Sequence, residues 1–159
     1  MRTLLSIAVL MMSLLSWATV LTHNDGPLTE AEIEQLNQVD SLIIHSGIRD
    51  KDFEHMWHAS FYGNLKYIDL GEQYDNGLYY RIPDSAFYRP FTQLLTYEWR
   101  SIKLEEVKIG TGWDQIGRAA FKGCTNLKKV DFPEGFHSVF ADAFEYCSSL
   151  KKIRHRRLS

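Results

Sequence analysis

This sequence of 159 residues has few cysteines and lacks the usual catalytic motifs. Its two cysteines, Cys124 and Cys147, are fewer ligands than a structural zinc site needs. No Ser-His-Asp pattern, glycine-rich phosphate loop or complete set of metal ligands is visible. Two pairs of carboxylates, Glu105/Glu106 and Asp50/Asp52, have a spacing that places them on the surface and not in a catalytic site. We therefore expect no cofactor and no enzymatic activity, with a hydrolytic enzyme as the weaker alternative.

A strong charge of either sign is also absent. Lys and Arg number 18 against 20 Asp and Glu, a net charge of −2, so a general nucleic-acid binder is not expected. Hydrophobic residues make up 45% and charged residues 24% of the chain. This balance is ordinary for a soluble globular domain, and it excludes a disordered chain and a polytopic membrane protein.

The one long apolar run is at the N-terminus. Arg2 precedes an apolar run from Leu4 to Leu15, and small residues follow up to Ala18. This is typical of a secretory signal cleaved after Ala18, and an uncleaved anchor is the alternative, although the run is short for a membrane span. No cysteine follows the run, which excludes a lipoprotein anchor. We expect an exported protein, in the periplasm, secreted or on the cell surface, without a membrane span after signal removal.

A repeated apolar pattern organises the rest of the chain. The pattern is Leu-x-x-Val/Ile-x-hydrophobic, and its clearest copy runs from Leu127 to Phe132. The copies begin at Val39, Leu65, Leu104, Leu127 and Leu150. A period in the low twenties with this spacing indicates a leucine-rich repeat solenoid. Because alternate side chains of a strand point to opposite faces, each copy predicts one short parallel strand with its fourth and sixth positions buried. Such turns must stack to bury a continuous core.

The first helix has several start signals. Thr29 fits as N-cap and Glu32 as its capping-box partner, while Leu28 and Ile33 occupy the positions of a hydrophobic staple. The helix should end near Gln38. We expect it to cap the open N-terminal end of the solenoid, as terminal repeats must do to stay soluble.

A second helix is expected after the first strand. Apolar residues recur at three- and four-residue steps from Phe53, and Asp50 or Asp52 can cap the helix. His55 and His58 lie on it three residues apart, but no further ligand completes a metal site. We expect these histidines to be solvated or packed, with no metal.

The two cysteines stand at the same phase of adjacent repeats. Equivalent positions on stacked strands lie about 4.8 Å apart. Parallel Cβ vectors would keep Cys124 and Cys147 beyond the roughly 3.5–4.5 Å between Cβ atoms that a disulfide needs. A ladder of buried free thiols is the first interpretation, and a disulfide, common in exported proteins, is the alternative.

A more specific signature occurs twice near the C-terminus. Ala-Phe-x-x-Cys-x-x-Leu-x-x-Val/Ile begins at Ala120 and again at Ala143. It resembles the BspA-type leucine-rich repeats of exported and surface proteins of bacteria, strongly in residues 104–153 and less so in 39–87. The resemblance implies a parallel-strand solenoid and a non-enzymatic role in binding or adhesion, without naming a target. It also implies four core positions: Ala120, Phe121, Ala143 and Phe144.

The segment from Gly71 to Ser101 departs from the regular repeat. The fragment from Ile82 to Phe87 matches the segment from Ile116 to Phe121 at the Ile, Ala and Phe positions, and about 11 residues are inserted after it. Aromatic residues concentrate in and just before the insertion: Tyr74, Tyr79, Tyr80, Phe91, Tyr97 and Trp99. Insertions in solenoids form loops on one face, often the binding face, so we take Tyr80, Tyr97 and Trp99 as candidate binding residues. A local apolar cluster that covers an irregular turn is the alternative.

Outward-facing strand positions should form two columns. The first column is Ser41, Tyr67, Glu106, Lys129 and Lys152, and the second is Ile43, Asp69, Lys108, Asp131 and Arg154. Solenoids use such concave surfaces for partners, and we expect Tyr67 to be an exposed aromatic contact. The candidate binding residues for a protein or glycan ligand are Tyr67, Asp69, Glu106, Lys108, Lys129, Asp131 and Lys152. A solvated face stabilised by cross-strand charge pairs is the alternative.

The last repeat is cut short after Ile153 and gives way to a basic tail. An open strand at this end can oligomerise, because its backbone is unpaired. A truncated or structural fragment without a ligand of its own is therefore the main alternative to an interaction module.

The sequence thus predicts an α+β fold, a short leucine-rich repeat solenoid with a parallel sheet on one face and an N-terminal helical cap. The expected organisation is a signal peptide (1–18), an unstructured leader (19–27) and a repeat domain (28–159) with an irregular insertion at about 71–101, regular repeats at 104–153 and a basic tail at 154–159.

Overall fold

The computed structural model describes residues 19–73, 80–88 and 102–155, with the backbone alone for 152–155. The expected signal peptide, the inserted residues Tyr97 and Trp99, and the end of the tail lie outside the described residues.

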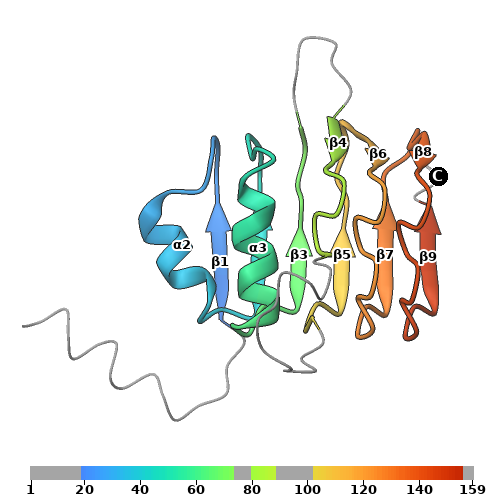
Figure 1. Ribbon diagram of the computed structural model, residues 1–159. Coiled ribbons are helices and arrows are strands. Elements are labelled where there is room, and N and C mark those ends of the chain that lie inside the picture. Colours follow the sequence, from blue (N-terminus) through green and yellow to red (C-terminus); the bar gives the residue numbers. More distant parts are fainter. Residues whose placement is uncertain (1–18, 74–79, 89–101, 156–159) are drawn as a thin grey trace, which may run out of the picture.

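Two parallel sheets and two helices make up the described chain. The larger sheet has the order β1 (Val20–His23), β2 (Ser41–Ile44), β3 (Tyr67–Asp69), β5 (Glu106–Lys108), β7 (Lys129–Phe132) and β9 (Lys152–His155). The smaller sheet has the order β4 (Tyr80–Ile82), β6 (Trp113–Ile116) and β8 (Ser138–Val139). The helices are α2 (Glu30–Leu36) and α3 (Asp52–Phe61). Figure 1 shows the strands of the larger sheet side by side, with α3 in front of the part between β1 and β3. The observed fold is therefore mixed α/β with parallel sheets.

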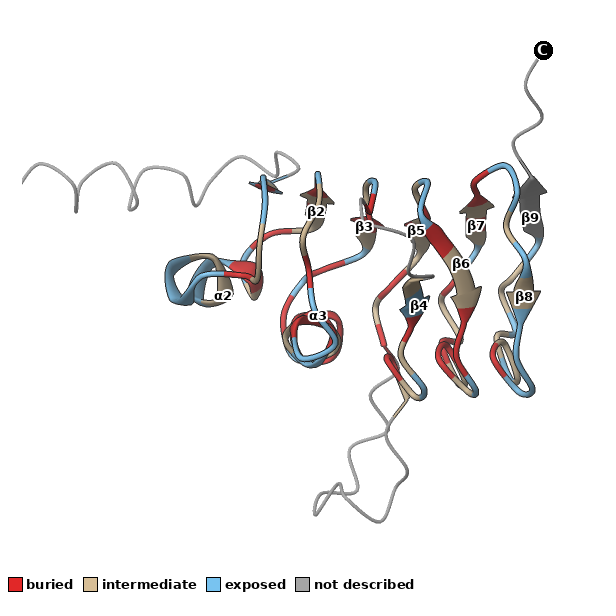
Figure 2. Cartoon of the chain, turned by 90° about the horizontal axis from the view of Figure 1, so that it is seen from above, coloured by how far each residue is buried: buried red, intermediate tan, exposed pale blue. Residues whose placement is uncertain are grey.

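The predicted repeat phase is confirmed in the larger sheet. The fourth positions of successive repeats, Leu42, Ile68, Val107 and Val130, lie opposite one another on neighbouring strands and are buried. Figure 2 shows both helices and the smaller sheet on one side of the larger sheet. The core lies between these layers, and each such buried side chain contributes about 1.5–3 kcal/mol.

The expectation of one strand per repeat is wrong, because the regular turns also carry a strand of the smaller sheet. Ile82 pairs with Ile116, and Ile116 with Val139, which confirms the matching of these segments. Three residues after each of these positions, the backbone enters the left-handed region, at Ser85, Ala119 and Asp142. The same tight turn therefore recurs without glycine.

Phenylalanine rings stack just inside these turns. Phe87 and Phe121 have centroids 5.1 Å apart, and Phe121 and Phe144 have centroids 5.4 Å apart, with nearly parallel planes. Ala120, Phe121 and Ala143 are buried, as expected of core positions. Phe144 is only partly buried, because its ring ends the described stack.

The expected unstructured leader is wrong for residues 20–23, which form β1 and pair with β2. Leu21 lies opposite Leu42, and His23 lies opposite Ile44. The inward alternation therefore continues, but a histidine replaces the apolar residue at the sixth position.

Helix α2 has the predicted capping box. The Glu32 amide donates to Thr29 Oγ1 at 3.3 Å, and the Thr29 amide donates to Glu32 Oε2 at 2.8 Å. The helix ends at Leu36, slightly before the expected Gln38.

The expected cap of α3 is wrong. Lys51 is the N-cap and makes no side-chain capping bond. Asp52 is instead the first helical residue, and its buried carboxylate accepts the amides of Leu28 at 3.3 Å and Arg49 at 2.8 Å. A carboxylate is favourable there because a helix N-terminus carries a partial positive charge.

Both cysteines are free thiols, in line with the first interpretation. Cys124 is buried, whereas Cys147 is half-buried and its thiol donates to the carbonyl of Phe121 at 3.1 Å. Burial raises the pKa of Cys124 well above its usual value and that of Cys147 to about 11. Both thiols are therefore protonated and poorly reactive at neutral pH.

Candidate functional site

The larger sheet presents the two predicted columns on the face turned away from the helices. Strand register aligns Ser41, Tyr67, Glu106, Lys129 and Lys152, and likewise Ile43, Asp69, Lys108, Asp131 and Arg154. We call this surface the outward face. In Figure 2 no described element covers it.

Charges on the outward face pair across the strands. Lys108 Nζ lies 2.5 Å from Asp69 Oδ2 in one column, and Lys129 Nζ lies 3.1 Å from Glu106 Oε2 in the other. Lys129 also joins the two columns, because its Nζ lies 2.9 Å from Asp131 Oδ2. Hydrogen bonds to Asp131 and Glu106 raise the pKa of Lys129, so its charge is secure at neutral pH.

Asp69 has a structural role that the sequence did not indicate. Its side chain is buried, with 8% of the residue exposed, and Oδ1 accepts the amide of Gly71 at 3.0 Å while Oδ2 accepts Lys108. Asp69 therefore fixes the turn after β3, and both of its oxygens are engaged within the chain.

The expectation of an exposed Tyr67 is wrong, because its side chain is half-buried. Burial, and next the charge of Asp69, raise the pKa of its hydroxyl. Tyr67 therefore stays neutral and offers part of its ring rather than a protruding side chain.

One oxygen of Asp131 has no hydrogen-bond partner in the part of the chain that the structure describes. Oδ2 contacts Lys129, but Oδ1 is buried and has no hydrogen-bond partner among the described residues. Buried polar atoms are normally paired, so an unpaired carboxylate oxygen needs an explanation.

The remaining predicted binding residues are placed differently. The backbone of Lys152 continues the first column on β9, while Tyr97 and Trp99 lie outside the described part of the chain. Tyr80 begins β4 and lines a cavity with Trp113 and residues 47–51. None of the outward-face residues lines that cavity.

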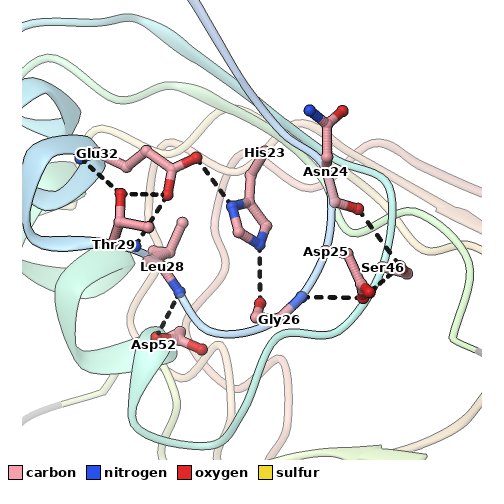
Figure 3. A network of polar contacts seen from close by, with 9 residues as sticks. All are labelled: His23, Asn24, Asp25, Gly26, Leu28, Thr29, Glu32, Ser46 and Asp52. Carbon is pink, nitrogen blue, oxygen red and sulfur yellow. Dashed lines mark hydrogen bonds and ion pairs between the residues drawn. The ribbon is translucent and has the colours of Figure 1, made fainter.

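A second polar cluster surrounds His23. This residue is buried, with 3% of its surface exposed. Figure 3 shows its ring between two acceptors, with Nδ1 2.9 Å from Glu32 Oε1 and Nε2 2.8 Å from the Gly26 carbonyl. Burial alone would lower its pKa, but the bonds to Glu32 and Gly26 outweigh it and raise the pKa. Burial would raise the pKa of Glu32, but the bonds from Thr29 and His23 lower it. With both ring nitrogens engaged, His23 joins β1 to α2 rather than offering an acid or base to a substrate.

The expected packing of the two histidines of α3 agrees with the structure at His58. Its Nδ1 lies 3.2 Å from Asn37 Oδ1, and its ring packs on Tyr62. Among the residues that the structure describes, no group of three or more His, Cys, Asp and Glu side chains is arranged to hold a metal. The outward face is therefore equipped for hydrogen bonding and charge pairing.

Comparison with protein families adds an independent finding. Residues 92–157, less than half of the chain, match the family model described as "BspA type Leucine rich repeat region (6 copies)". A comparison with curated proteins gave no match. The family suggests a protein-interaction module, is generally non-enzymatic and is typically extracellular or associated with a surface. Residues 92–157 are thus similar to a BspA-type leucine-rich repeat region, and the strands β5, β7 and β9 within them pair in register.

Proposed function

We propose that the chain is an exported, non-catalytic interaction module, which binds a protein or glycan partner through its outward face. The observation that carries this proposal is Asp131, whose Oδ1 has no hydrogen-bond partner among the described residues and whose Oδ2 contacts the charged Lys129. A partner that donates an N–H or O–H to Asp131 and approaches Lys129 with an acceptor would use both groups at once.

The proposed architecture is a short solenoid, with α2 as its N-terminal cap. Parallel strands in constant register support stacked turns. Leu36 of α2 is buried, and the capping box fixes where the helix begins. Exposed apolar edges at the ends of such an array reduce solubility, so a covering helix is useful there.

Export is supported by the sequence of the first 18 residues and by the typical location of the family. Among the described residues, no helix is long and apolar enough to cross a membrane. Final placement in the periplasm, in the medium or on the surface would follow from processing after Ala18.

A structural repeat fragment without a ligand is the second candidate. It is favoured by the pairing of Asp69 with Lys108 and of Glu106 with Lys129, because paired charges also occur on solvated sheet faces. Such cross-strand pairs contribute roughly 0.2–1 kcal/mol each.

The test is a binding screen of the purified chain on immobilised glycans and purified cell-surface proteins. Lys129→Met should reduce binding to the captured partner at least about tenfold, because a desolvated charge contact is lost. Asp131→Asn should also weaken it.

Lys122→Met is the matched control. Lys122 is likewise ion-paired, with Glu145, and its side chain is 24% exposed against 30% for Lys129, but it lies on a turn of the smaller sheet. Equal binding by the three variants and the parent, or no partner in the screen, would favour the structural fragment.

A further inference from the structure

A cavity of about 660 Å³ lies at the start of α3 and beside the smaller sheet. It is lined by Gly47, Ile48, Arg49, Asp50, Lys51, Tyr80 and Trp113. Its volume falls within the roughly 300–1,000 Å³ of typical small-molecule sites. Because it shares no residue with the outward face, it constitutes a separate candidate site.

Two aromatic rings form one wall of the cavity. Tyr80 and Trp113 are paired on neighbouring strands, and their ring centroids are 5.9 Å apart. Trp113 is held firmly, because its Nε1 donates to the Leu70 carbonyl at 3.2 Å and its ring packs edge-on against Phe53. The half-buried Tyr80 therefore presents its ring against a fixed support, and aromatic faces attract the slightly positive C–H groups of a sugar ring.

The opposite rim is charged. Arg49, Asp50 and Lys51 are exposed, and none of them forms an ion pair with a described residue. Both oxygens of the adjacent Asp52 accept backbone amides, and Asp52 forms no ion pair with a described residue. Within the described part of the chain, two cations and one carboxylate without ion-pair partners thus line a cavity with an aromatic wall.

The segment that carries this rim is fixed before any ligand binds. The Gly47 amide donates to Gln73 Oε1 at 3.3 Å, and Ser46 Oγ donates to Asp25 Oδ1 at 2.9 Å. Gly47 has φ of +81°, and a Cβ there would lie 2.1 Å from the Gly26 nitrogen. A rigid site binds more tightly, because little order is lost on binding.

We propose that this cavity binds an acidic sugar, a hexuronic acid residue at the end of a glycan. The guanidinium of Arg49 takes the carboxylate, since guanidinium and carboxylate match in a bidentate pair. Lys51 adds a second positive charge, Asp50 accepts a sugar hydroxyl, and Tyr80 packs on the apolar face of the ring.

Two other ligand classes fit less well. A quaternary ammonium ligand would use the aromatic wall, but it would meet Arg49 and Lys51 with like charge. A neutral sugar would leave both cations without a partner. The charge of the rim therefore favours the acidic sugar.

Calorimetric titration of the purified chain with methyl β-D-glucuronide and methyl β-D-glucoside tests the proposal. The two probes differ only at C6, which is a carboxylate in the first and a hydroxymethyl group in the second. We expect saturable binding of the glucuronide, at least about tenfold tighter than that of the glucoside. Raising the salt concentration should reduce this difference, because the rim is exposed.

Arg49→Gln should lower glucuronide affinity to the level of the glucoside, whereas Tyr80→Leu should weaken both sugars. Arg118→Gln, which alters an exposed arginine outside the cavity, should change neither. Because Arg49 is exposed, its variant will fold, which keeps the test valid should Tyr80→Leu unfold. Absent glucuronide binding, equal affinity for the two sugars, or tighter binding of choline than of glucuronide would overturn the proposal.

Discussion

At the scale of single residues, the contacts of His23 constrain its protonation state. Its two ring nitrogens face a carboxylate and a backbone carbonyl, and neither of these atoms can donate a hydrogen at neutral pH. Both nitrogens must therefore carry a proton for both bonds to exist. The raised pKa of His23 is consistent with this imidazolium, which Glu32 and the nearby charge of Asp52 stabilise.

Stability should consequently peak between about pH 4.5 and pH 6.5. The pKa of His23 is raised above 6.5 in the folded chain, so its contribution is complete below that pH and is lost as the pH rises through the folded pKa. The pKa of Glu32 is lowered below 4.5, so its contribution is present above that value and is lost as the pH falls through the folded pKa. Urea unfolding between pH 5.5 and pH 8 should show a declining free energy of unfolding.

His23→Leu should flatten that decline. It should also lower the free energy of unfolding at pH 5.5 by about 1.5–3 kcal/mol, which is what a hydrogen bond to a charged group contributes. His137→Gln alters an exposed histidine that contacts Asp114, and it should retain the decline. A decline of the same steepness in His23→Leu would contradict the assignment.

The phenylalanine stack predicts unequal costs for two equivalent residues. Phe121 is fully buried between two rings, so Phe121→Ala should cost about 3–5 kcal/mol. Phe144 is partly exposed and contacts Phe121 on one side, so Phe144→Ala should cost about 1–2 kcal/mol. Equilibrium unfolding in urea measures both, and equal losses would show that the last ring is covered.

At the scale of elements, the turn after β3 depends on glycine. Gly71 has φ of +56°, and a Cβ there would lie 1.8 Å from the carbonyl oxygen of Ile44 on the neighbouring turn. Gly71→Ala should therefore lower the free energy of unfolding by more than about 2 kcal/mol. The alanine would be strained at a positive φ, and the backbone of the neighbouring turn would also have to move.

Gly123→Ala is the matched control for this turn. Gly123 also has a positive φ, of +74°, but nothing lies within 4 Å of the position of its Cβ. Only the left-handed conformation is then penalised, by about 1–2 kcal/mol. Thermal unfolding of the two variants should rank Gly71→Ala as clearly less stable.

Elements that follow the apolar period could be predicted from the sequence. The same position of the repeat is occupied by Leu42, Ile68, Val107 and Val130. Their burial and the register of both columns could therefore be predicted from the repeat. Strand β1 was missed because His23 occupies an inward position, and its partner Glu32 is not recognisable as one without the fold. The strands of the smaller sheet were missed because they are too short to show an alternating pattern.

The sites were less predictable than the strands. Periodicity placed Asp69 on the outward face, but it did not show that the amide of Gly71 holds that carboxylate. The cavity joins residues 47–51 to Tyr80 and Trp113, which are far apart in sequence. Such a site depends on how separate turns meet, and local spacing contains no signal for it.

At the scale of the whole molecule, the described sheet ends in two unlike edges, β1 and β9. Several exposed apolar side chains belong to the last turn, next to β9: Val139, Phe140 and Tyr146. An edge strand beside apolar surface favours pairing with another chain. We therefore expect self-association through the C-terminal edge.

Urea unfolding at two protein concentrations about a hundredfold apart should show this association. For a dimer that unfolds to monomers, the hundredfold rise in concentration should increase the apparent free energy of unfolding by about 2.7 kcal/mol per dimer. Tyr146→Ser, at a position that is 69% exposed, should reduce the dependence without loss of folding. A steep transition with the same midpoint at both concentrations would mean that the monomer is stable alone.

The constant step of the last strands limits how this chain can change in length. Residues 106, 129 and 152 are aligned on β5, β7 and β9, so one turn takes 23 residues. A duplication or deletion of one such unit in the gene would lengthen or shorten the sheet by one strand and keep both columns in phase. An insertion of a single residue within a strand would exchange its inner and outer side chains. Descendants of this sequence should therefore differ in length by whole turns, with other insertions confined to the connections between strands.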